Sequence, residues 1–202
     1  MKKVWTLVFL SFFLQITSMS LAQTEGKIVL SADSFRKKHN VALIYRNWKY
    51  KPGDNMDWAA PTFDDSDWEI TDSLLIPYKL PKGGWDGIGW FRLHLEVDET
   101  LWNQPLVLNS IHIGAAEIYL DGQLIYAFGE VGTSKATEKI DFTSFFHPRV
   151  GEISFGNQTH HVLAVRYSNF TALSYKWTNI SQLGFGMFQI IGFGMTINTI
   201  FS

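Results

Sequence analysis

Apolar and polar residues alternate with a period of two through the middle of the chain. The clearest stretch is WFRLHLEVD (90–98), which sets Phe91, Leu93, Leu95 and Val97 against Arg92, His94, Glu96 and Asp98. Successive side chains of a strand point to opposite faces, so this pattern predicts a strand with one buried and one polar face. PLVLNSIHI (105–113) and HHVLAVRYSN (160–169) predict further strands.

Turn residues between such runs indicate how the strands connect. In AEIYLDGQLIYAFG (116–129), Asp121-Gly122 stands between two runs rich in β-forming residues, which predicts a tight hairpin whose turn residues both accept positive φ. SADSFRKKHN (31–40) is the one helix that the pattern predicts. Many short strands without a βαβ alternation predict an all-β fold, a single antiparallel β-sandwich of the jelly-roll type.

The N-terminal residues have the pattern of an export signal. MKKVWTLVFLSFFLQITSMSLA begins with two lysines, continues through an uncharged apolar run and ends at small residues that a signal peptidase reads. We therefore expect residues 1–22 to be a cleaved signal peptide, the alternative being a buried or membrane-anchoring helix. Export implies a periplasmic location or the cell-surface face of the inner membrane.

Composition and net charge restrict the partners and the source of stability that we expect. Removing the two lysines of the signal from 17 basic residues leaves 15 against 19 acidic ones, a formal charge of −4. No basic patch favours nucleic acid as a partner. The chain has no cysteine, so an ordinary apolar core must stabilise it. We expect residues 23–182 to form that single sandwich domain.

The C-terminal residues leave two structures open. LGFGMFQI (183–190) is followed directly by IGFGMTIN (191–198), and there is no charged residue from Trp177 to Ser202. Length and lack of charge favour a membrane segment, whereas glycine at every second position favours a strand with one crowded face. Residues 183–202 are thus either the last strand of the sandwich or the start of a membrane-proximal apolar segment.

Five carboxylates crowd the stretch DWAAPTFDDSDWEI (57–70). Asp64, Asp65 and Ser66 are turn formers whose short side chains bond to their own backbone, so we predict a turn that anchors the sheet. A calcium loop of the EF-hand kind would need a glycine among the ligands, and this stretch has none. We expect no metal site and no cofactor, with a structural calcium ion and a ligand cleft as the alternatives.

Four motifs resemble a known domain. NWKYKPGDNMDWAAPTFDDSDWEI, GIGWFRLHLEVDETLW, AAEIYLDGQLI and HVLAVRYSN stand in the order of the corresponding motifs of the sugar-binding jelly-roll domain in family 2 glycoside hydrolases, a galactose-binding-like fold. The resemblance spans about residues 47–169. Asp121 departs from it, because the hydrolase pattern usually has Asn there. The chain also resembles the periplasmic N-terminal sensor domains of bacterial membrane receptors of the histidine kinase or phosphatase type.

Candidate ligand contacts lie in KGGWDGIGWFR (82–92). Flat aromatic faces and planar polar groups are what a sugar site needs, and this stretch offers Trp85, Asp86, Trp90 and Arg92 around four glycines. The alternative is that Trp90 fills the core and Arg92 pairs with a carboxylate. Adjacent His160 and His161 point to opposite faces of a strand and cannot share one metal ion.

The acids stand in turns or on solvent faces, so we predict no catalytic pair and no enzyme activity in this segment. The expected function is an extracytoplasmic module that senses a ligand for a bacterial membrane signalling protein. Its expected partners are a carbohydrate or another periplasmic ligand, a second copy in a homodimer, and the membrane through a downstream segment. The alternatives are an accessory sugar-binding domain of a secreted glycoside hydrolase and a structural sandwich that only dimerises.

Overall fold

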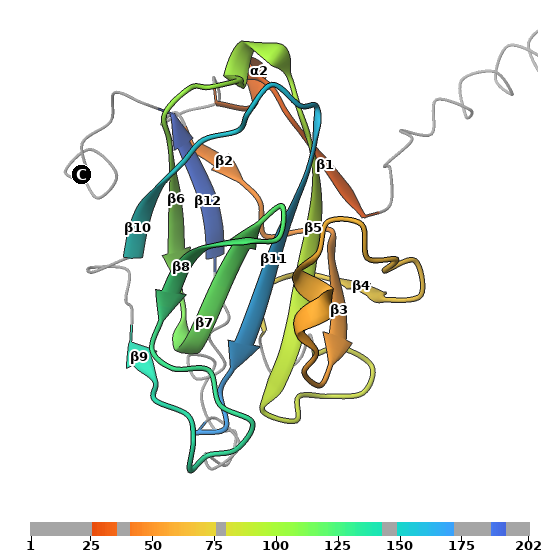
Figure 1. Cartoon of the computed structure of the whole chain (residues 1–202), viewed down its shortest axis with the longest axis vertical. Coiled ribbons are helices and arrows are strands. Elements are labelled where there is room, and N and C mark those ends of the chain that lie inside the picture. Colours follow the sequence, from red (N-terminus) through yellow and green to blue (C-terminus); the bar gives the residue numbers. More distant parts are fainter. Residues whose placement is uncertain (1–25, 36–40, 76–79, 143–148, 172–186, 193–202) are drawn as a thin grey trace, which may run out of the picture.

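The computed structural model describes residues 26–35, 41–75, 80–142, 149–171 and 187–192, and in this part of the chain the strands form two facing sheets (Figure 1). The larger sheet has the order β4 (Glu69–Thr71), β3 (Trp48–Pro52), β5 (Ile88–Val97), β11 (His160–Ser168), β7 (Ile113–Leu120) and β8 (Gln123–Phe128), with β1 (Lys27–Leu30) on β5 and β9 (Asp141–Phe142) on β7. The smaller sheet has the order β10 (Arg149–Ile153), β6 (Leu106–Ile111), β12 (Met187–Gly192) and β2 (Val41–Leu43).

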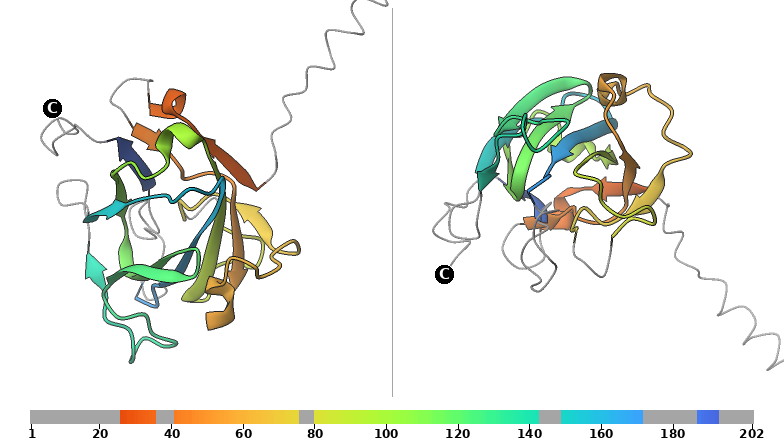
Figure 2. Two further views of the ribbon diagram at one scale, coloured as in Figure 1. Left: turned by 45° about the horizontal axis from the view of Figure 1, so that its top comes forward. Right: turned by 90° about the horizontal axis from the view of Figure 1, so that it is seen from below.

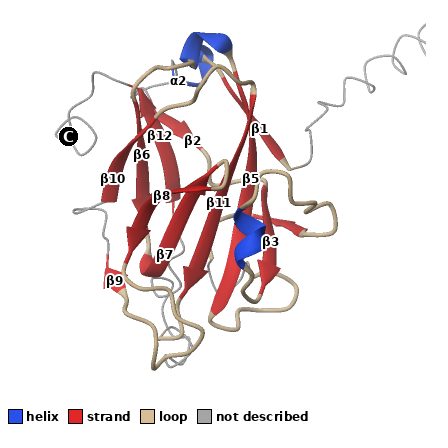
Figure 3. Ribbon diagram, in the orientation of Figure 1, coloured by secondary structure: helices blue, strands red, loops and turns tan. Residues whose placement is uncertain are grey.

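The predicted all-β class and the antiparallel sandwich are confirmed. Among the described strands every pairing is antiparallel except that of β1 with β5. Helical segments are short: α2 (Ala32–Phe35) and the 3-10 turns η1 (Met56–Ala59) and η2 (Glu99–Leu101) (Figure 3). Of the helix predicted over 31–40, residues 36–40 lie outside the described residues. None of the helices described is long and apolar enough to span a membrane.

The two sheets face each other (Figure 2), and the side chains of the main core pack between them. The inward face of β5 contributes Phe91, Leu93 and Leu95, each at most 1% exposed. From the smaller sheet, Leu108 and Ile190 belong to the same cluster. The alternation predicted for residues 90–98 therefore has the predicted buried face. The opposite face departs from the prediction at Arg92, which is buried completely.

The predicted hairpin at Asp121-Gly122 is confirmed. Leu120 pairs with Gln123, so the loop consists of these two residues, with φ of 50° and 83°. The Asp121 carboxylate accepts a hydrogen bond of 2.8 Å from the backbone N–H of Val162. The turn is thereby fixed to β11.

Tyr126 connects the two sheets along one edge of the sandwich. The Tyr126 hydroxyl on β8 donates to the carbonyl of Glu152 on β10. A Cβ atom on Gly151 would lie 2.0 Å from the Tyr126 ring, so only glycine permits this approach. The contact joins the edge strands of the two sheets.

The terminal predictions fall largely beyond the described residues. The predicted export signal over 1–22 lies outside them, as do 183–186 and 193–202. Within the C-terminal segment, Met187–Gly192 form β12, which lies between β6 and β2.

Candidate functional site

The outer face of the larger sheet carries a second, smaller core. Segment 54–68, which includes η1, crosses the outer face of β5 (Figure 1). Its aromatic residues pack on two strand residues in what we call the outer cluster: Trp58, Phe63 and Trp68 on Trp90 and Tyr119. Trp58 meets Trp68 edge-on at 5.2 Å between ring centroids, and Trp90 stacks on Tyr119 at 5.6 Å. The segment thus gives this face an apolar cover of its own.

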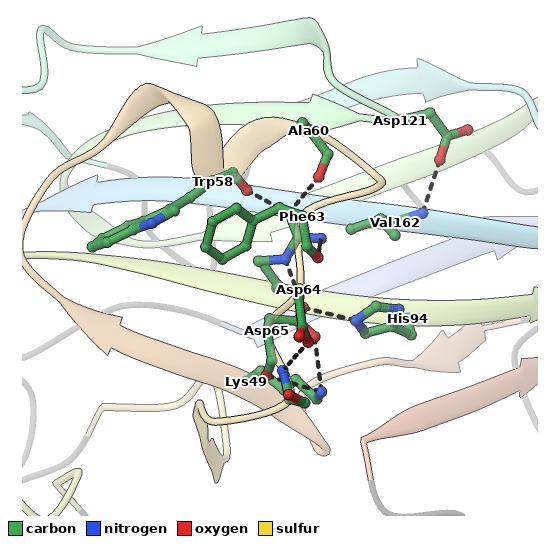
Figure 4. Close-up of polar contacts among 11 residues, drawn as sticks. Lys49, Trp58, Ala60, Phe63, Asp64, Asp65, His94, Asp121 and Val162 are labelled. Carbon is green, nitrogen blue, oxygen red and sulfur yellow. Dashed lines mark hydrogen bonds and ion pairs between the residues drawn. The ribbon is translucent and has the colours of Figure 1, made fainter.

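A buried carboxylate anchors the end of this segment. Asp65, only 4% exposed, accepts from Lys49 Nζ at 2.8 Å, from Arg92 Nε at 2.6 Å and from His94 Nε2 at 2.8 Å (Figure 4). Lys49 comes from β3, whereas Arg92 and His94 stand two residues apart on β5 and therefore share its outer face. One carboxylate thus ties the segment to two strands.

Arg92 completes this anchor from the sheet side. Its Nη1 donates to the carbonyl oxygens of Trp58 and, at 3.0 Å, of Ala60, and Nη2 donates to that of Phe63 at 3.4 Å (Figure 4). The guanidinium therefore binds three backbone carbonyls of segment 54–68, of which that of Ala60 also accepts from the Phe63 N–H at 3.1 Å. Its planar fork, unlike a lysine ammonium, reaches all of them together with Asp65.

The environment of Asp65 determines its protonation state. Burial alone would raise the pKa of this carboxyl, but hydrogen bonds from His94, Lys49 and Arg92 outweigh burial and hold the pKa well below its usual range. Asp65 is consequently ionised at neutral pH.

The start of the segment is held in the same way. Asp54 accepts from Arg166 Nε at 2.7 Å and Nη2 at 2.6 Å, and from Trp90 Nε1 at 3.1 Å. These hydrogen bonds, above all those from Arg166, lower the pKa of Asp54. Segment 54–68 is thus pinned by a carboxylate near each end.

The other aspartates of segment 54–68 face solvent. Asp64 accepts from the backbone N–H of Ser66 at 3.0 Å, which is the turn that the sequence predicts. Asp67 is 70% exposed and pairs with Lys51 at 3.0 Å. Among the described residues, no group of three or more His, Asp or Glu side chains is placed to hold a metal ion. The expectation of a domain without a cofactor stays a prediction.

The four residues predicted to contact a ligand do not form one surface. Trp85 and Trp90 are 5% and 0% exposed; Trp85 packs on Tyr167 in the main core, and Trp90 lies in the outer cluster. Arg92 is buried under segment 54–68. Asp86 alone is exposed. Buried rings cannot stack on a sugar, so the packing alternative describes Trp90 and Arg92 and extends to Trp85.

A cleft opens beside the Asp65 network, where β1, β5 and β11 lie side by side. Its volume is about 350 Å³. Polar residues from these strands and from the β7–β8 turn line it: Lys27, His94, Glu96, Asp121, His160 and His161. Pro61 of segment 54–68 borders the cleft and packs near Gly122 of the turn. His94 belongs to both the cleft and the Asp65 network.

Charged pairs organise the cleft. Lys27 Nζ lies 2.7 Å from Glu96 Oε1, and His160 Nδ1 lies 3.9 Å from the same oxygen. The hydrogen bond from Lys27 lowers the pKa of Glu96. The two neighbouring histidines diverge as predicted, because the side chain of His160 is 75% exposed and that of His161 only 3%.

His161 forms part of the cleft wall together with the hairpin turn. Its Nδ1 lies 2.6 Å from Asp121 Oδ2 and its Nε2 lies 3.0 Å from the carbonyl oxygen of Gln158. Both partners can accept a hydrogen bond, so a ring N–H on either nitrogen of His161 has an acceptor within reach. The Asp121 carboxylate is thereby occupied by His161 and by the Val162 N–H.

No family model and no curated protein matches the chain. Solved structures do. A calcium-binding mutant of Bacteroides uniformis β-glucuronidase 2 matches with a TM-score of 0.55 and 18% identity over 74% of this chain and 17% of that chain. A Bacteroides uniformis β-glucuronidase gives 0.52 and 18% over the same shares, and a glycosyl hydrolase family 2 member from Bacteroides cellulosilyticus gives 0.50 and 15% over 75% and 20%.

These matches bear on the fold. The sandwich is shared with family 2 glycoside hydrolases, as the sequence resemblance predicts, and this chain spans about a fifth of their length. The resemblance to receptor sensor domains stays a prediction.

Proposed function

We propose that this chain is a non-catalytic accessory domain that binds carbohydrate, of the kind found in glycoside hydrolases. One observation carries the proposal: the structural likeness covers 74% of this chain but only 17% of the β-glucuronidase. What the two share is therefore a single domain-sized unit of a much larger enzyme. This was the alternative, rather than the main, functional prediction from the sequence.

The lowered pKa values of Asp65 and Glu96 support a role without catalysis. A glycosidase needs a carboxylic acid with a raised pKa and a second carboxylate, about 5–5.5 Å away in retaining enzymes and about 6.5–9.5 Å away in inverting ones. The pKa values of Asp65 and Glu96 are instead lowered by their cationic partners. Neither residue is therefore suited to donate a proton at neutral pH.

The cleft lined by His94, Glu96 and His160 is the ligand site in this proposal. It is concave and carries several ionisable side chains, and it rests on three strands of one sheet, a rigid support for a binding site. It replaces the stretch 82–92 as the proposed place of contact, because the aromatic rings of that stretch are buried.

Export to the periplasm belongs to the same proposal, as does a homodimer. The role of ligand-sensing input module of a membrane receptor rests on the sequence resemblance, whereas the fold comparisons favour the hydrolase accessory domain.

Binding and hydrolysis are tested together on the whole chain. A panel of oligosaccharides, neutral and acidic, is titrated calorimetrically, and the corresponding nitrophenyl glycosides are assayed for release of nitrophenol. We expect saturable binding of at least one glycan, weakened by His160→Ala, and no release. Turnover above the uncatalysed rate, or no binding by any glycan, contradicts the proposal.

A further inference from the structure

The network beneath the cleft carries more positive than negative charge. Within the described part of the chain, Asp65 is the carboxylate that pairs with Lys49, Arg92 and His94 alike. Lysine and arginine are both charged at neutral pH, so the group keeps at least one uncompensated positive charge even with His94 neutral. His94 extends from this group into the cleft, where its side chain is 28% exposed.

The cleft itself adds the ammonium group of Lys27, which pairs with the partly exposed carboxylate of Glu96. Lys27 on β1 and Glu96 on β5 form an ion pair of 2.7 Å, with side chains 43% and 33% exposed. An exposed pair of this kind contributes little to stability and exchanges partners readily. His160 stands at 3.9 Å from the same carboxylate and is the most exposed of the three. Two basic side chains thus converge on one acidic group that a ligand can displace.

The lining also determines which ligands are excluded. Among the described residues that line the cleft, none is Trp, Tyr or Phe, so stacking on a sugar ring supplies no affinity. Asp121, the other acid of the wall, is already matched by His161 and by the Val162 N–H. Recognition must therefore come from charge and hydrogen bonds.

We propose that this cleft binds the carboxylate of an acidic sugar, a uronate, through Lys27 and His160, with His94 as a further donor. Glu96 competes with the ligand for Lys27 and so sets its affinity. This inference rests on the proposed carbohydrate-binding function and adds the class of sugar. The same chemistry would suit other oxyanions, so the test separates a uronate from sulfate.

The titratable groups facing the ligand make binding stronger in acid. The cleft is lined by His94 and Glu96 from β5, Lys27 from β1, His160 and His161 from β11 and Asp121 from the turn. Asp65 of segment 54–68 is buried and contacts His94. As pH falls from about 8 to about 5.5, histidine side chains gain protons while a uronate keeps its charge. We expect about tenfold tighter binding at the lower pH.

The probes are trigalacturonate, its methyl ester, galactotriose and inorganic sulfate, each titrated into the whole chain. We expect trigalacturonate to bind more tightly than the two uncharged sugars. Lys27→Gln weakens its binding about fivefold and Glu96→Gln tightens it by a similar factor. Lys139→Gln and Glu130→Gln are matched controls, since these residues form an exposed pair of 2.6 Å away from the cleft, and both leave affinity unchanged.

The outcomes separate the two proposals. If the uncharged sugars bind as tightly as trigalacturonate and Lys27→Gln changes nothing, the uronate inference is wrong while carbohydrate binding stands. If sulfate competes at the concentration at which trigalacturonate binds, the cleft is a general oxyanion site and the inference is also wrong. If no sugar binds, both proposals fail. Thermal unfolding of each variant establishes that a lost affinity is not a lost fold.

Discussion

The two faces of the larger sheet are covered in different ways. The inner face packs against the smaller sheet through apolar side chains such as Leu93, Leu163 and Val165, all 0% exposed. The outer face is covered over β5 by segment 54–68, which brings three aromatic rings and one buried carboxylate. A whole sheet covers one face, and a single loop covers part of the other.

The difference shows which interactions allow a loop, rather than a second sheet, to cover the face of a sheet. Apolar burial is non-directional, so the inner core requires volume and shape rather than particular atoms. Segment 54–68 is a single loop, and in addition to its apolar contacts it is held by directional, charge-assisted bonds at Asp54 and Asp65. We therefore expect the outer face to be sensitive to pH and to single polar atoms, and the inner face to be sensitive to volume.

The largest expected effect comes from Asp65→Ala. It leaves Arg92, 0% exposed, without its carboxylate, and an uncompensated buried charge costs about 3–5 kcal/mol. The measurement is the free energy of unfolding in urea at pH 7. Asp64→Ala is the matched control: it removes the adjacent, solvent-facing carboxylate and should have a far smaller effect. Equal losses for the two variants would contradict the anchor role of Asp65.

Comparison of the wild type with Asp65→Ala also tests how the contribution of Asp65 to stability depends on pH. Because the pKa of Asp65 is lower in the folded chain than the unfolded value of about 3.9, its ionisation stabilises the fold above that value, and the contribution is lost as pH falls below it. The difference in stability between wild type and Asp65→Ala should thus be constant from pH 7 to about 5 and narrow below about 4. A difference that does not change with pH would contradict this assignment.

A somewhat smaller loss is expected in the inner core. Leu163→Ala on β11 removes a fully buried side chain between the sheets and should cost about 3 kcal/mol. The cost arises from lost transfer free energy and a cavity, so it should be the same at pH 7 and pH 4, unlike that of Asp65→Ala. Leu124→Ala on β8, where the side chain is 54% exposed, is the control and should change stability little.

Sequence alternation was enough to locate β5, β11 and the β7–β8 hairpin because each of these is specified within about ten residues. It could not show that Arg92 is buried, since its cover comes from segment 54–68 and not from its own strand. Nor could it distinguish Asp65 from Asp64, which have the same chemistry and differ only in the direction of the side chain.

The cleft was missed for a related reason. His94 and Glu96 were assigned to the polar face of β5, but Lys27 reaches Glu96 across 69 positions of sequence through the parallel pairing of β1. His160 joins them by its register opposite Glu96. Pairing between distant strands leaves no local signal, whereas the aromatic-rich stretch 82–92 resembles a sugar site and is in fact largely core.

The smallest expected effect tests whether the hydrogen bonds of a single polar atom stabilise the apolar inner core as they stabilise the outer face. Tyr167 and Tyr50 are both buried there, but the Tyr167 hydroxyl donates to the carbonyl of Ile113 and accepts from Asn169 Nδ2, whereas that of Tyr50 has no hydrogen-bond partner among the described residues. Tyr167→Phe should therefore cost about 1–2 kcal/mol, because it removes both of these hydrogen bonds, while Asn169 Nδ2 still donates to the Ile113 carbonyl at 3.0 Å. Tyr50→Phe removes an unsatisfied hydroxyl without changing the ring, so stability should be unchanged or rise by up to about 1 kcal/mol. Urea unfolding of the two variants measures both. If neither substitution changes stability, ring packing alone determines the contribution of both tyrosines. Directional hydrogen bonds would then matter for the outer face but not for polar atoms within the inner core.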